Sequence, residues 1–109
     1  AIDIAPAAIE ATLANVALNA VSQKFVIERG DINSVKGRYD LVLANILAPV
    51  LLADRDAILG RVAARGTLIL SGFTDSRLHD IIESYESAGC RQRNLHEVDG
   101  WYGLELQCP

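Results

Sequence analysis

Methionine, long apolar runs and clustered basic residues are all missing from this chain of 109 residues. Because it contains no methionine and opens on Ala1, we interpret it as an excised or truncated piece of a longer protein. No apolar run approaches the ~20 residues that cross a bilayer, and no segment has the basic start of a signal peptide. We therefore expect no membrane partner and a cytoplasmic location.

Cysteine, histidine and positive charge are scarce. The net charge is -4, which argues against direct contact with nucleic acid, because neutralising a phosphate backbone requires clustered Lys and Arg. Cys90 and Cys108 have neither metal-ligand spacing nor a disulfide framework, which suits a reducing compartment. His79 and His96 lie among polar residues and should face solvent. The sequence therefore predicts no metal site.

Hydrophobic residues make up 50% of the chain and charged residues 22%. This composition is typical of a folded protein that buries a modest core. At this length the chain forms one domain at most, which we expect to span residues 1–109.

The segment from Tyr39 to Pro49 contains an apolar run that ends on one amide side chain. The run from Leu41 to Ala44 does not alternate, which predicts a strand buried on both faces of a parallel sheet between helices. Asn45 then lies at the carboxyl end of that strand, where open α/β sheets bind ligands. Its amide both donates and accepts hydrogen bonds, so it is a candidate site residue. The alternative is an amide that bonds a neighbouring backbone group in a turn.

Helices and strands alternate along most of the chain. The pattern predicts a helix over 6–19 with Pro6 in its first turn, a strand over 25–27 and a turn over 28–31. A helix from Pro49 should close at Gly66, and a strand should follow over 67–71. The next helix should be capped near Thr74, Asp75 or Ser76 and end at Gly89 in a left-handed conformation. Its apolar stripe consists of Leu78, Ile81, Ile82 and Tyr85.

The last twenty residues change character. Asp99-Gly100 is a strong signal for a two-residue hairpin turn, and apolar residues alternate from Tyr102 to Cys108. A simple turn would pair Arg91 with Cys108, which would put Cys90 out of register and on the opposite face. A disulfide is then disfavoured unless a bulge intervenes. We therefore expect two free thiols and a closing antiparallel hairpin.

Several segments, in this order, carry a resemblance to a known family. They are Ala1-Ile2-Asp3-Ile4-Ala5-Pro6, Asn15 to Asn19, Gly30-Asp31-Ile32, Tyr39 to Ala48, Leu70-Ser71-Gly72-Phe73 and Trp101. Together they resemble the ribosomal protein L-eleven methyltransferase (PrmA-like) family over essentially the whole chain. The resemblance implies an α/β, Rossmann-like class I methyltransferase sheet flanked by helices. It also implies S-adenosylmethionine as cofactor and a ribosomal protein as the substrate of amino-group methylation.

The resemblance also implies roles for individual residues. Asp3, with Ile4 beside it, matches the cofactor-binding strand tip, where the carboxylate accepts hydrogen bonds from both ribose hydroxyls. Asp31 and Ile32 match residues that contact the adenine, although a Gly-Asp pair after a strand is also an ordinary turn. Asn45 matches the residue beside the transferring methyl group, where its oxygen holds the attacking amine.

This chain also departs from the family pattern. Ala5 replaces a second acid, Arg65 stands where a Gly-Gly pair is common, and Arg77 holds a position often occupied by Gln. The first strand and the glycine-rich loop that holds the methionine part of the cofactor are absent. Open sheet edges would result, which predicts a possible homodimer that shares strands.

Two functions remain open from the sequence. The first is a methyltransferase of which this chain is the carboxyl-terminal part, inactive alone; Asp3 and Asn45 favour it. The second is a truncated or degenerate module that keeps the fold for association without catalysis; Ala5 and the absent loop favour that. A glycine-rich loop encoded immediately before Ala1 would favour the enzyme.

Overall fold

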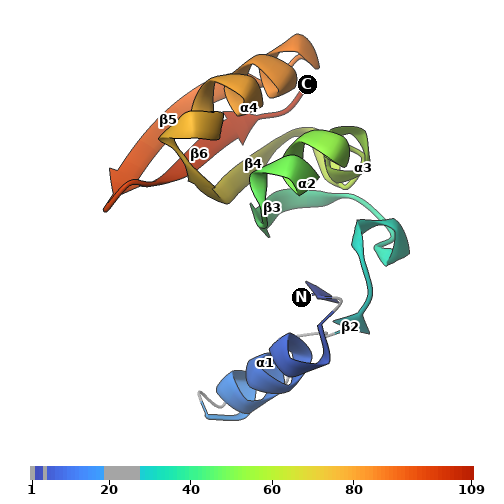
Figure 1. The fold of residues 1–109 in the computed structure, drawn as a ribbon. Coiled ribbons are helices and arrows are strands. Elements are labelled where there is room, and N and C mark those ends of the chain that lie inside the picture. Colours follow the sequence, from blue (N-terminus) through green and yellow to red (C-terminus); the bar gives the residue numbers. More distant parts are fainter. Residues whose placement is uncertain (1, 4, 19–27) are drawn as a thin grey trace. The chain divides into compact units, whose positions relative to one another are not determined.

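The computed structural model describes residues 2–3, 5–18 and 28–109 and divides into two compact units, Ala1–Lys36 and Gly37–Pro109 (Figure 1). Within the described residues, every helix is too short or too polar to span a membrane.

The first unit contains one helix and a two-stranded parallel sheet. Strand β1 (Ile2–Asp3) pairs with β2 (Glu28–Arg29), and helix α1 (Pro6–Leu18) follows β1. The predicted helix start at Pro6 is confirmed, and Asn19 lies outside the described residues. The strand predicted over 25–27 also lies outside them. The turn predicted to begin at Glu28 was placed too early, because Glu28 and Arg29 still pair with β1.

The second unit is built on a four-stranded sheet. Strands β3 (Tyr39–Asn45), β4 (Val62–Thr74), β5 (Arg91–Val98) and β6 (Trp101–Gln107) lie in the order β3-β4-β6-β5. The β3–β4 pair is parallel, whereas β6 runs antiparallel to both of its neighbours. The predicted α/β architecture with a closing antiparallel hairpin is confirmed.

Helices α2 (Ala48–Ala53), α3 (Arg55–Leu59) and α4 (Asp75–Ser87) lie over one face of this sheet (Figure 1). Alternate residues of β4 and β6 point into the same layer, because Leu68 pairs with Leu106 and Leu70 with Leu104. All four are fully buried. The core also includes Leu51, Ile58, Val62, Phe73, Ile81 and Tyr85.

Strand β3 forms where it was predicted but is not buried on both faces. Leu41 and Leu43 remain 55% and 68% exposed, whereas Val42 and Ala44 are half-buried. Two features explain the difference. Strand β3 is one of the two edge strands of the four-stranded sheet, and Leu41 and Leu43 point away from the face that the helices of this unit cover. A continuous apolar run indicates only that a strand suits a buried position, not that this unit covers it.

The helix predicted from Pro49 to Gly66 is wrong at its carboxyl end. Two short helices, α2 and α3, meet at Asp54, and α3 ends at Leu59 with Gly60 as its cap. Val62 is instead the first residue of β4, where it is fully buried and pairs with Tyr39. Gly66 lies inside β4, so this strand begins five residues earlier than the predicted Thr67.

Helix α4 follows its sequence pattern closely. Ile81 and Tyr85 are fully buried, and Leu78 and Ile82 are half-buried. The helix begins after Thr74, at the predicted cap position, although the Thr74 side chain makes no capping hydrogen bond.

The end of α4 is also as predicted. Gly89 has a φ of 97°, which glycine adopts without a Cβ penalty. Its N–H donates to the Glu86 carbonyl and the Cys90 N–H donates to the Tyr85 carbonyl, at 3.0 and 3.1 Å. This pair of bonds is the Schellman arrangement that satisfies the last carbonyls of a helix.

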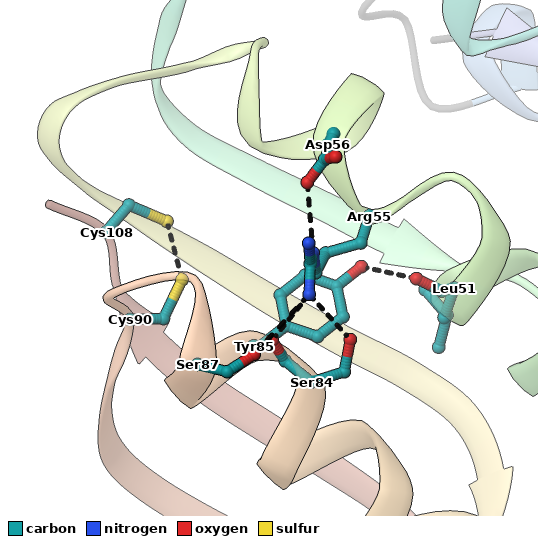
Figure 2. Close-up of polar contacts among 8 residues, drawn as sticks. All are labelled: Leu51, Arg55, Asp56, Ser84, Tyr85, Ser87, Cys90 and Cys108. Atoms are coloured by element: carbon teal, nitrogen blue, oxygen red, sulfur yellow. Dashed lines mark hydrogen bonds and ion pairs between the residues drawn. The ribbon is translucent and has the colours of Figure 1, made fainter.

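Polar contacts tie α4 to the two short helices (Figure 2). The Tyr85 hydroxyl donates to the Leu51 carbonyl at 2.7 Å in the core. The Arg55 guanidinium donates to the carbonyl of Ser84 at 3.0 Å and to its hydroxyl at 3.3 Å. These bonds satisfy buried or half-buried polar groups, which would otherwise carry a desolvation cost.

The hairpin turn is confirmed, and a bulge corrects its register. Asp99 and Gly100 both have positive φ, of 52° and 84°, as a two-residue turn of this type requires. Val98 pairs with Trp101 directly across the turn. Arg91, however, pairs with Gln107 rather than with Cys108, because the register shifts between Gln92 and Asn94.

The bulge brings the two cysteines together. Their Sγ atoms lie 3.9 Å apart as buried free thiols (Figure 2), so the prediction that they occupy opposite faces is wrong and the prediction of free thiols is confirmed. Burial raises the pKa of the Cys90 thiol and, with Cys90 beside it, raises the pKa of Cys108 to about 12. Both thiols are therefore held in the protonated form near neutral pH.

Candidate functional site

Asn45 is the last residue of β3, and its exposed side chain lies at the carboxyl end of the parallel strand pair. It pairs with Ser71 of β4, so an amide and a hydroxyl side chain occupy neighbouring positions at this edge. Among the residues described, none forms a hydrogen bond with the Asn45 side chain. The amide thus lies at the carboxyl end of the strand as the sequence predicted, and the structure adds that its side chain is exposed.

The chain that follows Asn45 is anchored in the core. The N–H groups of Val50 and Leu51 donate to the Leu47 carbonyl at 2.9 and 3.0 Å, which begins α2 two residues after Ile46. Ala48 and Leu51 are buried. The strand end therefore turns directly into a packed helix, which limits the freedom of the backbone that carries Asn45.

Gly72 packs against Asn45 from β4. It has a φ of 91°, and a Cβ built on it would lie 2.7 Å from Asn45 Oδ1 and 3.0 Å from the Ile46 carbonyl oxygen. The β4–β6 register shifts between Ser71 and Phe73, so Gly72 is the extra residue of a bulge. Gly72 was not predicted as a site residue, although it belongs to the segment Leu70-Ser71-Gly72-Phe73 that carries part of the family resemblance. The missed signal is a glycine directly after the buried run that pairs with β3.

Asp3 is the last residue of β1, where it pairs with Arg29 of β2. This places its backbone at the carboxyl end of a parallel strand, as predicted. Ile4, the adjoining predicted cofactor-binding residue, lies outside the described residues.

Asp31 and Ile32 follow β2 in the same unit. The Asp31 carboxylate accepts a hydrogen bond from the Asn33 N–H at 2.9 Å and caps the short 3-10 helix η2 (Ile32–Ser34). The Ser34 hydroxyl donates to the Asp31 carbonyl at 2.7 Å. Ile32 is half-buried. Gly30-Asp31 therefore forms a turn, which was the alternative interpretation from the sequence. A carboxylate offers about four lone-pair sites, so this one hydrogen bond leaves Asp31 with acceptor capacity for a ligand.

The candidate site residues are divided between the two units. Asp3, Asp31 and Ile32 belong to Ala1–Lys36, where β1 and β2 run parallel and so end at one edge of their sheet. Asn45 and Gly72 belong to Gly37–Pro109. Across the part of the chain that the structure describes, no group of three or more His, Cys, Asp or Glu side chains is arranged to hold a metal ion. His79 and His96 are exposed, as predicted.

Solved structures that share this fold include methyltransferases. A ribosomal protein L11 methylase from Lactobacillus delbrueckii subsp. bulgaricus superposes with a TM-score of 0.85 at 25% identity, over 99% of this chain and 57% of that chain. Trm5 from Methanocaldococcus jannaschii, solved in complex with adenosine, superposes with a TM-score of 0.72 at 23% identity, over 99% of this chain and 35% of that chain. At 23% identity, the similarity to Trm5 shows a shared fold and nothing more. The fold is that of a class I methyltransferase.

The sequence comparisons assign the family. A family model described as "Ribosomal protein L11 methyltransferase (PrmA)" matches residues 1–108. A ribosomal protein L11 methyltransferase from Pelotomaculum thermopropionicum is 33% identical over 105 residues, which are 95% of this chain and 34% of the relative. The chain belongs to the ribosomal protein L11 methyltransferase (PrmA) family. It spans about a third of the length of that curated relative.

Proposed function

We propose that this chain is the carboxyl-terminal part of a cytoplasmic enzyme that methylates amino groups of a ribosomal protein with S-adenosylmethionine. The observation that carries the proposal is the exposed Asn45 amide at the carboxyl end of β3, with Gly72 packed against it. Family membership supports it. The methyl acceptor would be a protein amine rather than a nucleic acid, which is consistent with the acidic net charge of -4.

The residues of the first unit fit the nucleoside part of this cofactor by their chemistry. A carboxylate accepts hydrogen bonds only, so Asp3 suits a pair of ribose hydroxyls at the end of β1. The remaining acceptor capacity of Asp31 suits the adenine amino group, and the half-buried Ile32, with Ile4, suits the apolar faces of the base. These four residues would hold the cofactor.

Asn45 would orient the acceptor amine. When bound, S-adenosylmethionine would supply an electrophilic methyl group and, as its S–CH3 bond breaks, leave as S-adenosylhomocysteine. The Asn45 Oδ1 accepts a hydrogen bond from the amine N–H and so turns the nitrogen lone pair toward that methyl carbon. The nitrogen must be unprotonated to attack, and a neutral amide stabilises the ammonium form less than a carboxylate at this position would. Positioning of this kind accounts for much of the rate of a direct displacement.

Cofactor binding tests the proposal. We expect S-adenosylhomocysteine to bind, in a calorimetric titration, a form of this chain extended upstream to include a glycine-rich loop, and not the chain alone. Asp3→Ala should weaken that binding ~100-fold, because two charge-assisted hydrogen bonds are lost. Asp80→Ala, which removes an exposed carboxylate from α4, is the matched control and should bind normally. Absence of binding by both forms would contradict the proposal.

A second candidate, association without catalysis, is favoured by one observation. Strand β3 is an edge strand, and its Leu41 and Leu43 are more than half exposed. Long apolar edges of this kind pair with other chains. A second copy of this chain is the proposed partner, through a shared sheet at β3.

Sedimentation measures this association. We expect the chain to sediment as a dimer, and Leu43→Lys to shift it to a monomer because a charged side chain opposes pairing at the edge. Val98→Lys is the matched control, since Val98 is 69% exposed against 68% for Leu43 but lies in the hairpin. A monomer before substitution, or equal effects of the two variants, would exclude the dimer.

A further inference from the structure

We propose that Gly72 is a positioning residue that fixes the orientation of the Asn45 amide. The inference concerns the local geometry of the site, and its catalytic consequence rests on the proposed function. A Cβ on residue 72 would lie 2.7 Å from Asn45 Oδ1, a distance that real Cβ contacts do not show. The backbone of Gly72 therefore closes one side of the amide.

The backbone conformation at this position also requires glycine. The φ of 91° lies in a region that residues with a side chain rarely adopt. The conformation arises because β4 inserts Gly72 as an extra residue between Ser71, which pairs with Gly103, and Phe73, which pairs with Tyr102. A bulge of this type re-aims neighbouring groups, and such bulges are frequent next to active sites.

The two sides of the bulge are held firmly. Phe73 is buried and stacks on Tyr102 with ring centroids 6.3 Å apart, and Ser71 pairs with Asn45 across the parallel ladder. Gly72 therefore has little freedom to move away from Asn45. The amide must accommodate the glycine, and its Oδ1 is confined to the space that the missing Cβ leaves.

This confinement has a consequence for the proposed reaction. An exposed amide at a strand end has access to several χ1 and χ2 values. The Gly72 backbone on one side excludes some of these Asn45 side-chain conformations before any ligand binds. Less conformational entropy of the side chain is then lost when the amine binds. Gly72 would therefore affect kcat through Asn45 without contacting the substrate itself.

Nuclear magnetic resonance of the chain itself tests the geometry. In 15N-labelled protein, Gly72→Ala should shift the side-chain amide signals of Asn45, which Asn45→Ala identifies by their loss. Gly100→Ala is the matched control for backbone strain, because Gly100 has a similar φ of 84° and a Cβ there would meet nothing within 4 Å. Unchanged Asn45 signals in Gly72→Ala would overturn the proposal.

A double-mutant cycle separates the contact from the strain. Gly72→Ala should lower the melting temperature, and the decrease should be smaller in an Asn45→Ala background, because alanine has no Oδ1 to collide with the new Cβ. Part of the decrease should remain, since the Ile46 carbonyl oxygen is also near. Strictly additive effects would overturn the proposed contact. Where Gly72→Ala is too unstable to study, Gly72→Asn provides a second variant, since Asn tolerates positive φ better.

Kinetics of the upstream-extended protein then tests the consequence. Gly72→Ala should lower kcat ~10–100-fold, while the affinity for S-adenosylhomocysteine stays unchanged. Gly100→Ala should leave both values unchanged. If Asn45→Ala lowers kcat and Gly72→Ala does not, the positioning role is overturned and the proposed function stands. If Asn45→Ala leaves kcat unchanged, the proposed function fails instead, and any catalytic role of Gly72 through Asn45 fails with it.

Discussion

Asn45→Ala should lower kcat for amine methylation ~100–1,000-fold in a protein that supplies the complete cofactor site, with little change in cofactor affinity. The substitution removes the acceptor that holds the amine at the carboxyl end of β3. Because the affected interaction orients the reacting nitrogen, the loss should appear in kcat rather than in KM. Initial rates measured across amine concentrations at saturating S-adenosylmethionine separate the two.

The controls for this prediction use the same kind of side chain. Asn94→Ala removes another exposed amide, whose oxygen accepts a hydrogen bond from the adjoining Leu95 N–H at 3.0 Å, and should leave kcat unchanged. Asn45→Asp keeps an acceptor at nearly the same place and should retain part of the activity at amine concentrations that saturate. An Asn45→Ala variant that raised KM alone would show that Asn45 contributes only to binding.

Tyr85→Ala is expected to cost ~3–5 kcal/mol of unfolding free energy, the largest effect in the core. Tyr85 is fully buried and its hydroxyl donates to the Leu51 carbonyl. Tyr85→Phe keeps the ring and leaves that buried carbonyl without its partner, so it should cost ~1–3 kcal/mol. Urea unfolding of the three proteins, followed by circular dichroism, measures both differences. Equal costs for the two substitutions would contradict this account of the core.

We also expect ionisation of Tyr85 to lower the free energy of unfolding at alkaline pH. Burial, and next the neighbouring Cys90, raise the pKa of Tyr85 above its usual value of 10.0. The folded state therefore favours the neutral phenol, and the associated stability is complete below about pH 10 and is lost as the pH rises above it. The Cys108 thiol, whose pKa burial raises from 9.0 to about 12, begins a similar loss near pH 9.

The alkaline loss can be assigned to Tyr85 by comparison with Tyr85→Phe. Each such group contributes at most ~1.4 kcal/mol per pH unit to the slope. Urea unfolding between pH 8 and pH 11 should therefore show a shallower decline above pH 10 in Tyr85→Phe than in the unsubstituted chain. Parallel declines would mean that the tyrosine does not titrate with unfolding.

Local patterns predicted much of the fold. The spacing of Ile81 and Tyr85, the glycine after α4 and the Asp99-Gly100 turn each depend on backbone preferences within a few residues, and the structure confirms them. Features set by distant partners were not predictable in this way. The bulge in β5 changes the pairing of Arg91, and the early start of β4 at Val62 depends on its pairing with Tyr39.

The candidate site also has parts that local sequence predicts and parts that depend on distant residues. Position at a strand end is a local property, so the place of Asn45 follows from the apolar run that precedes it, whereas the place of Asp3 was implied by the family resemblance. The contribution of Gly72 depends on its contact with Asn45, which lies on another strand and 27 positions earlier in the sequence. Nothing in a local pattern distinguishes such a glycine from one in an ordinary turn.

Because β3 is an edge strand, a further strand that paired with it in parallel would also border the candidate site. Any strand that pairs in parallel with β3 ends at the edge where Asn45 lies, because parallel strands share their direction. Its final residues would form a second wall around the amide. Binding at that edge and strand pairing at β3 would then be thermodynamically linked, so that each raises the apparent affinity of the other by the same factor.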